Sequence, residues 1–211
     1  MAPKNNRDPV SSLELTLRIP LTYARSGRNL AWAAMAGARE LRPLEHHPAH
    51  DVVDAHTGCR FYYHGHDLPG APSAWHGHFH LFVPHPKGTG FSHLAALALS
   101  DQGMPQQWFS TNQWVTGESW ASARQLKTAL SSYAVATSGR LSPVAQWVSA
   151  FVSLEQDTLI ELLRARDARL AELSSQRSQA RVLADRRVHV LSMRAVRWLE
   201  KFAPPSSSLT H

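Results

Sequence analysis

Two runs of the sequence, residues 59–66 and 75–83, alternate between large apolar side chains and histidines. Successive side chains along a β-strand point to opposite faces, so this period of two predicts strands rather than helices. Phe61 and Tyr63 occupy odd positions in the first run, as Phe79 does in the second. If the runs pair with both apolar sets against one core, the histidines at even positions lie together on the opposite face. A shift of one residue would destroy this match, so the pattern also predicts the register.

The predicted register gathers histidines from both runs on one face of the sheet. They are His64, His66, His76, His78 and His80. Side chains opposed on neighbouring strands have Cβ atoms about 5 Å apart, so such imidazoles can converge on one atom. Neutral imidazole is the commonest metal ligand, and three or four suit zinc, iron or copper. We therefore expect a transition-metal site, and a catalytic one would keep a position open for water or substrate. The simpler alternative is a set of half-exposed histidines on a polar sheet face.

Other residues are candidates to complete such a site. Glu118 is a carboxylate that can orient a ligand imidazole or act with His78 in catalysis, and Asp54 and Asp67 are further carboxylates near the runs. A second group lies in and just after the last predicted strand. Its aromatic rings and a polar side chain could form a pocket for a flat small-molecule ligand. Its members are Trp108, Asn112 and Trp114. Core packing and turn formation are the simpler interpretation of this group. The odd position of His93 in its strand does not decide which face of the sheet it occupies. The sequence also leaves open whether the loop with His46, His47 and His50 joins the site.

The run from His76 to Phe82, His-Gly-His-Phe-His-Leu-Phe, resembles the histidine-triad motif of nucleotide hydrolases and transferases. In that family the middle histidine attacks an α-phosphate, which implies His78 as the nucleophile here. The run departs from the motif at Gly77, where the family has an apolar residue. It also follows another histidine-bearing strand, whereas the family's strand usually follows a helix. A nucleotidyl hydrolase or transferase is therefore the alternative function.

A broader resemblance rests on residues 61–66, 77–82 and 108–118, which read FYYHGH, GHFHLF and WFSTNQWVTGE. These runs look like those of a family of uncharacterised bacterial proteins, over roughly residues 30–125. The resemblance implies that the three runs belong to one site, and it implies no reaction.

Charge is distributed unevenly along the 211 residues, whose formal net charge is +6. Residues 46–142 are neutral overall and hold eleven of the thirteen histidines, while the flanking segments are basic. In the last third, acids alternate with the basic residues, which is typical of a solvated helix face. A nucleic-acid-binding or scaffold role for these basic helices is the third, less favoured hypothesis.

Several absences narrow the class of protein. A single cysteine, Cys59, excludes a disulfide framework and a multi-cysteine zinc site. No run of eighteen apolar residues is present, and the first ten residues lack the apolar core of a secretory signal. We therefore expect a cytoplasmic protein without a membrane segment.

The expected fold is α+β, with an antiparallel meander of four or five strands, an N-terminal helix and a long C-terminal helical hairpin. The four central strands are expected at residues 59–66, 75–83, 91–100 and 106–111. Before them we expect a half-buried strand at 13–19, a helix at 29–41 and a loop at 43–57. After them we expect a helix at 119–136.

The last third is expected to hold two long helices, one of about thirty residues from Ser142 and another ending near Leu199. The expected organisation is a disordered tail at 1–10, a histidine-rich domain at 11–140, the hairpin packed on it at 141–203, and a disordered tail at 204–211. The hairpin would carry more apolar surface than such a sheet readily covers, and two outcomes fit: it caps the sheet within one chain, or part of it packs against its copy in a symmetric dimer. A homodimer through these helices is the favoured outcome.

Overall fold

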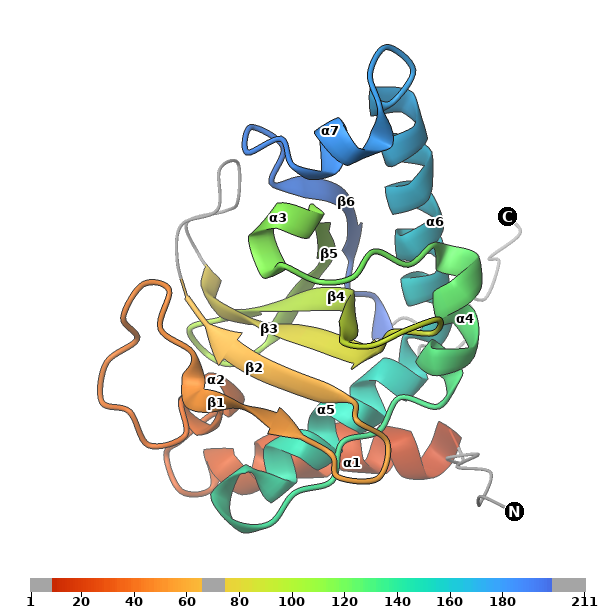
Figure 1. The fold of residues 1–211 in the computed structure, drawn as a ribbon. Helices are drawn as coiled ribbons and strands as arrows, with labels where there is room; N and C mark the ends of the chain where they lie inside the picture. The colour runs from red at the N-terminus through yellow and green to blue at the C-terminus, as the bar shows by residue number, and fades with distance from the viewer. Residues whose placement is uncertain (1–8, 66–74, 199–211) are drawn as a thin grey trace, which may run out of the picture.

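The computed structural model describes residues 9–65 and 75–198, and they form an α+β fold around one six-stranded sheet (Figure 1). All neighbouring strands are antiparallel and follow the order of the sequence, which confirms the predicted meander. The strands are β1 (His47–Val53), β2 (Arg60–His64), β3 (Trp75–Pro84), β4 (Phe91–Ser100), β5 (Pro105–Thr111) and β6 (Val190–Ala195). The predicted ligand His66 and the carboxylate Asp67 lie outside the described residues.

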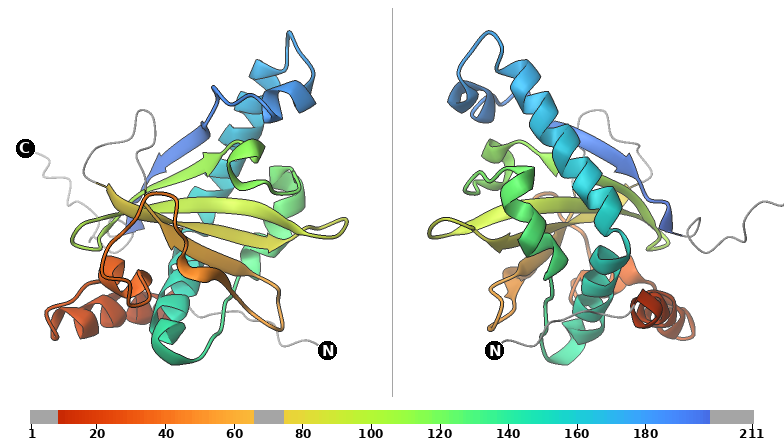
Figure 2. Two further views of the ribbon diagram at one scale, coloured as in Figure 1. Left: turned by 60° about the vertical axis from the view of Figure 1, so that its left-hand side comes forward. Right: turned by 90° about the vertical axis from the view of Figure 1, so that its right-hand side faces the viewer.

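Helices cover one side of this sheet, where α4, α5 and α6 cross it (Figure 2). The helices are α1 (Pro9–Ala24), α2 (Leu30–Ala34), α3 (Gln113–Thr116), α4 (Ala123–Ser131), α5 (Ser142–Leu154), α6 (Gln156–Leu173) and α7 (Gln179–Leu183), with a 3-10 turn η1 (Gly139–Leu141). Helices α2 and α4 are shorter than the predicted segments 29–41 and 119–136. Within the described residues, no helix combines the length and the apolar character that a membrane crossing requires.

The core lies between the helices and the odd-numbered apolar residues of β2 and β3. Phe61, Tyr63 and Phe79 are fully buried there, as the alternation predicts. Trp147 and Phe151 of α5 stack on each other at 4.7 Å between ring centroids and close the core from the helix side. His64, His78 and His80, at even-numbered positions, therefore face the other side of the sheet.

The predicted strand at 13–19 is wrong, because Pro9–Ala24 forms helix α1. The alternating leucines suggested a strand, but the side chains that pack inward follow helical spacing: Ser12, Thr16 and Ile19 are buried. Pro20 lies inside this helix and lacks the N–H that would bond the Thr16 carbonyl. That carbonyl instead accepts a hydrogen bond of 3.1 Å from Nε1 of Trp147 on α5. The tertiary contact thus compensates for the proline.

Two further segments are strands at the edges of the sheet. Residues 47–53, expected within a loop, pair with β2 as β1. Residues 190–195, expected in the second long helix, pair with β5 as β6. The free edge of β5 offers this segment backbone hydrogen bonds, and Ser192 adds a side-chain bond of 2.9 Å to the Leu162 carbonyl of α6. The meander therefore has six strands, more than the four or five expected.

The long apolar helix predicted from Ser142 is present as two consecutive helices, α5 and α6, which meet at the buried Glu155. No second long helix pairs with them within the described residues, since a five-residue helix α7 and β6 follow. The apolar stripe of α5 and α6 is buried inside the chain. This stripe therefore does not provide the exposed apolar surface on which the predicted homodimer rests. The homodimer stays a prediction, which light scattering tests by comparing the mass in solution with the 23.5 kDa of one chain. Residues 1–8 and 204–211, predicted as tails, lie outside the described part, while residues 9 and 10 begin α1.

Candidate metal centre

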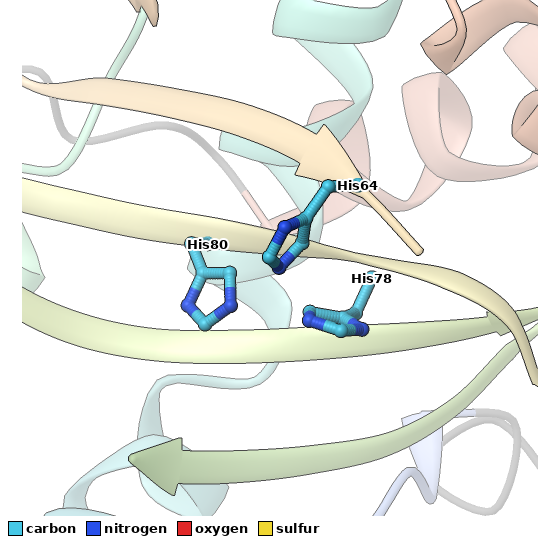
Figure 3. Close-up of side chains that lie close together, drawn as sticks. All are labelled: His64, His78 and His80. Atoms are coloured by element: carbon cyan, nitrogen blue, oxygen red, sulfur yellow. The ribbon is translucent and has the colours of Figure 1, made fainter. Parts of the chain in front are cut away.

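Three histidines meet on the sheet face opposite the core, and all three are buried (Figure 3). The register of β2 and β3 places His64 directly opposite His78, and His80 opposite Tyr62. The ring centroids of His64 and His78 lie 4.5 Å apart, and that of His80 lies 5.0 Å from the first and 4.9 Å from the second. One ring nitrogen from each comes within 4.8 Å of the other two. The register predicted from alternation therefore creates the cluster.

Small side chains on β4 leave room for these rings. His78 pairs with Ala98 across the β3–β4 ladder, and His80 pairs with Ala96. Each alanine side chain ends at Cβ, so the imidazoles lean over β4 without a competing large neighbour. Phe109 of β5 bounds the cluster on that side, with its ring 5.2 Å from His78. The three rings are thus surrounded by other side chains of the sheet.

His76 does not join the cluster, although its parity matches that of His78. Trp75 pairs with Ser100 and Gly77 with Leu99, so His76 is an extra residue in a β-bulge. The bulge reverses the alternation at this end of β3. His76 consequently points to the core side, where its Nδ1 lies 2.8 Å from the Tyr63 hydroxyl. The predicted five-histidine face is wrong at this position, and the motif run 76–82 does not present three histidines on one face.

A second bulge brings His93 to the cluster. Leu81 pairs with Ala95 and Phe82 with His93, so Leu94 is the extra residue on β4. Without the bulge, His93 would face the core together with Ala95. Its Nε2 instead lies 3.0 Å from Nδ1 of His80. Sequence parity left the face of His93 undecided, because a bulge cannot be located from alternation alone.

Burial, a neighbouring charge and hydrogen bonds determine the protonation state and the tautomer of His93. Burial, and to a smaller extent the positive charge of Arg166, lower its pKa to about 3, so its ring is neutral. A neutral imidazole has one donor and one acceptor nitrogen. Nδ1 of His93 lies 3.3 Å from the Thr111 hydroxyl, and Nε2 contacts His80. If His80 donates from Nδ1, His93 accepts at Nε2 and carries its own proton on Nδ1 towards Thr111. This arrangement leaves Nε2 as the nitrogen that His80 presents to the cluster.

His46 lies at the exposed side of the cluster and also contacts it. Its ring stacks on Tyr62 with centroids 3.7 Å apart and meets His64 edge-on at 5.7 Å. The imidazole is 3.7 Å from a carboxylate oxygen of Asp51. Of the loop histidines left open in the sequence, His47 pairs with Tyr63 instead and His50 is exposed.

Glu118 lies outside the histidine cluster, since no carboxylate of the described residues belongs to that group. The side chain is buried and accepts a hydrogen bond from the Thr116 hydroxyl. Burial raises the pKa of its carboxyl to about 8, although the Arg166 guanidinium acts to lower it. Glu118 is close enough to contribute to the raised pKa of Tyr62. Glu118 therefore lies near the cluster as a mostly protonated carboxyl at neutral pH and does not supply a ligand.

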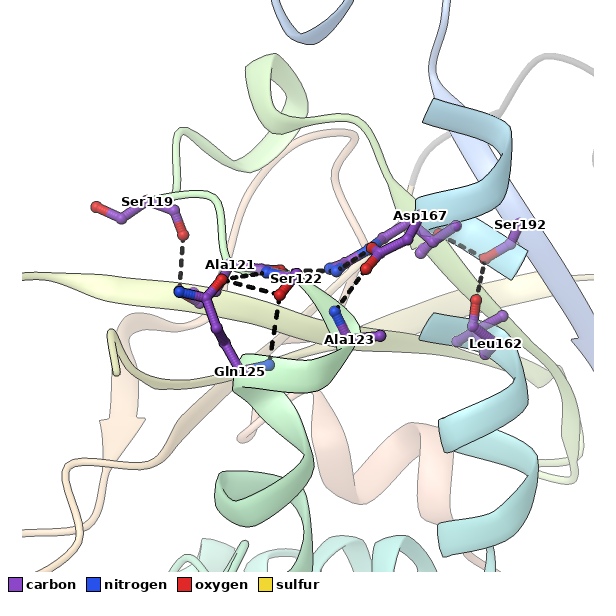
Figure 4. Close-up of polar contacts among 11 residues, drawn as sticks. Ser119, Ala121, Ser122, Ala123, Gln125, Leu162, Asp167 and Ser192 are labelled. Carbon is purple, nitrogen blue, oxygen red and sulfur yellow. Dashed lines mark hydrogen bonds and ion pairs between the residues drawn. The ribbon is translucent and has the colours of Figure 1, made fainter. Parts of the chain in front are cut away.

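Arg166 and Asp167 of α6 anchor the segment that follows Glu118 (Figure 4). Arg166 donates to the Ala121 carbonyl at 2.7 Å and lies over the Trp120 ring, while Asp167 accepts from the Ala123 amide at 2.7 Å. Ser122 then caps α4 through a capping box. These contacts fix the turn that carries Glu118 against the sheet.

The residues expected to wall a ligand pocket have structural positions instead. Trp108 faces the core and stacks on Phe151 at 5.7 Å. Asn112 caps α3 and donates to the Val182 carbonyl at 2.8 Å. Trp114 donates from Nε1 to the Val188 carbonyl at 2.8 Å. Asp54 accepts from backbone amides, including that of Ala136, so it also stabilises the fold.

The fold and the site define an α+β protein with a buried three-histidine cluster on an antiparallel sheet. Residues 13–196 match the family model described as Domain of unknown function (DUF6969), and the chain belongs to this family. Membership confirms the resemblance to an uncharacterised family. No curated protein and no solved structure matches the chain.

Proposed function

We propose that this protein binds one transition-metal ion, zinc, iron or copper, through His64, His78 and His80. The observation that carries the proposal is the approach of three ring nitrogens to within 4.8 Å of one another. Metal–nitrogen bonds of about 2.0–2.1 Å in a tetrahedral site separate the ligand atoms by roughly 3.3 Å. Metal binding would require the three rings to adjust until their nitrogens reach that separation. Imidazole ligands favour these metals over calcium or magnesium, which prefer oxygen.

The environment of His80 supports the proposal. Histidines that bind metal usually donate their other N–H to a neighbouring acceptor, which fixes the tautomer and the ring orientation. His93 supplies that acceptor at 3.0 Å, and Thr111 follows it at 3.3 Å. His93 is therefore a positioning residue for the proposed ligand.

We further propose that the site is that of a mononuclear metalloenzyme. Three imidazoles leave one position of a tetrahedral ion open for water or a substrate, as in catalytic zinc sites. An ion there would supply Lewis-acid chemistry. The chain's own contribution is to hold three imidazole donors in a buried site between Tyr62 and Phe109, where little water competes.

Metal analysis of protein purified without an affinity tag tests the proposal. The expected result is about one equivalent of a single transition metal, lost in variants His64→Ala, His78→Ala and His80→Ala. His76→Ala is the matched control, because His76 lies on the same strand and faces the other way; it should retain the metal. Less than about a tenth of an equivalent, with no stabilisation by added zinc, iron or copper, would refute metal binding. Hydrolysis of an adenosine phosphoramidate that resists chelators and is lost in His78→Ala would instead support the nucleotidyl-transfer alternative.

A further inference from the structure

A cavity of about 520 Å³ lies away from the histidines, where the end of α1 meets α2 and η1. Six residues line it: Tyr23, Arg28, Trp32, Ala33, Gly37 and Arg140. None of them belongs to the sheet, so this cavity is separate from the proposed metal centre.

The cavity is cationic. Arg28 and Arg140 both line it, and no acidic side chain does. Among the described residues, no carboxylate lies within 4.0 Å of either guanidinium, whereas eight other arginines have such a partner. Two like charges at one cavity repel each other unless an anion lies between them.

Arg140 is held in place by the backbone of residues 36 and 37. Its Nη1 donates to the Ala36 carbonyl at 3.0 Å, across 104 residues of sequence. Gly37 has φ +95°, and a Cβ there would lie 2.0 Å from the same Nη1. The missing side chain thus admits the guanidinium, and the positive φ favours glycine for a second reason. The charge is therefore positioned in advance of any ligand.

Apolar and polar groups complete the wall. Trp32 is 43% exposed, and the Arg28 guanidinium lies 4.2 Å from its ring centroid. The Tyr23 hydroxyl is buried and has no hydrogen-bond partner within the described structure. Burial raises the pKa of that hydroxyl, so it stays a neutral donor. The oxygen of this hydroxyl is inaccessible to solvent, so Tyr23 lines the cavity through the rest of its side chain.

We propose that this cavity binds a small organic oxyanion that carries a planar ring. Guanidinium groups match the geometry of phosphate and carboxylate, and two of them favour a doubly charged phosphate monoester. The exposed Trp32 ring offers a surface for the planar group.

Isothermal titration of the full chain with four probes tests this site. Phenyl phosphate combines both features, benzoate exchanges the anion, inorganic phosphate lacks the ring, and benzyl alcohol lacks the charge. We expect phenyl phosphate to bind with a Kd of about 1 mM or tighter, and inorganic phosphate and benzyl alcohol to bind at least about tenfold more weakly. Benzoate binding as tightly as phenyl phosphate would support a site for planar oxyanions and overturn the preference for a doubly charged phosphate. The proposal would be overturned if none of the four probes bound with a Kd below about 10 mM.

Charge variants locate the binding. Arg140→Gln and Arg28→Gln should each weaken phenyl phosphate by about tenfold or more, through loss of a charge-assisted hydrogen bond. Arg25→Gln is the matched control, since Arg25 is exposed beside α1 and does not line the cavity. An equal loss in Arg25→Gln would mean that only net charge matters and would refute the site. Arg28 is itself exposed, so Arg28→Gln keeps the test valid if Arg140→Gln does not fold.

Discussion

Nδ1 of His80 lies 3.0 Å from Nε2 of His93, although the two residues occupy neighbouring strands at positions of opposite parity. The bulge at Leu94 makes this contact, because it turns His93 away from the core. The pair links the proposed metal ligands to Thr111 on a third strand.

The contact predicts the effect of replacing His93. His93→Leu removes the acceptor that orients His80, so zinc affinity should fall by about 10-fold to 100-fold. His93→Gln keeps an acceptor and should recover part of this loss. Competition with a chelating indicator measures the affinity, with His76→Ala as the control. Unchanged affinity in His93→Leu would show that His93 does not position a ligand.

The bulge in β3 makes a prediction about Gly77. A Cβ at this position would lie 2.7 Å from the His64 carbonyl and 2.7 Å from the Tyr63 hydroxyl. Gly77→Ala should therefore lower the free energy of unfolding by about 1–3 kcal/mol and weaken metal binding through His64. Gly88→Ala is the control, because its nearest contact would be 3.3 Å, to the His85 ring. Urea unfolding of Gly77→Ala and Gly88→Ala measures the change in the free energy of unfolding. Equal, small changes in the two variants would contradict the bulge geometry.

The raised pKa of Glu118 predicts a pH dependence of stability. The folded chain holds the Glu118 proton up to about pH 8, whereas the unfolded chain releases it in the ordinary glutamate range. This carboxyl therefore lowers the free energy of unfolding as pH rises through that window.

Glu118→Gln removes this loss. The free energy of unfolding of the variant relative to wild type should rise by on the order of 2–3 kcal/mol between about pH 5 and pH 7. Urea unfolding across this range measures the difference. The control is Glu14→Gln, whose side chain is 71% exposed and should show no such trend. A flat difference for Glu118→Gln would contradict the buried carboxyl.

A double-mutant cycle tests the compensation for Pro20 in α1. Trp147→Phe keeps the aromatic packing but removes the donor to the Thr16 carbonyl, and should cost about 1–3 kcal/mol. In a Pro20→Ala background the helix supplies its own donor to that carbonyl, so the same change should cost less. Equal costs in both backgrounds would show that the Trp147 bond does not replace the missing helix bond.

The sequence predicts the histidine cluster correctly where the strands alternate regularly. Alternation places His64, His78 and His80 on one face. The pairing of β2 with β3 runs without a register shift up to the pair formed by His64 and His78. Alternation fails at His76 and is silent at His93, because both positions depend on β-bulges. A bulge is a tertiary compromise between two strands, so neither strand's sequence reveals it alone.

Fold prediction failed where a local pattern competed with a tertiary partner. The leucines of residues 13–17 alternate, but α1 packs through small residues such as Ser12 and Thr16. Residues 190–195 carry apolar spacing that fits a helix, but the open edge of β5 recruits them as a strand. The sequence offers Trp108 as a wall of a ligand pocket, but Trp108 packs in the core, while the neighbouring Phe109 faces the other side of the sheet.

X-ray absorption spectroscopy of the zinc-loaded, untagged protein identifies the atoms that coordinate the metal. We expect three imidazole nitrogens at about 2.0–2.1 Å with one further light ligand, and the loss of one imidazole in His78→Ala. His76→Ala should leave the spectrum unchanged. A spectrum without imidazole scattering, or with a sulfur ligand at about 2.3 Å, would contradict a metal centre built from His64, His78 and His80.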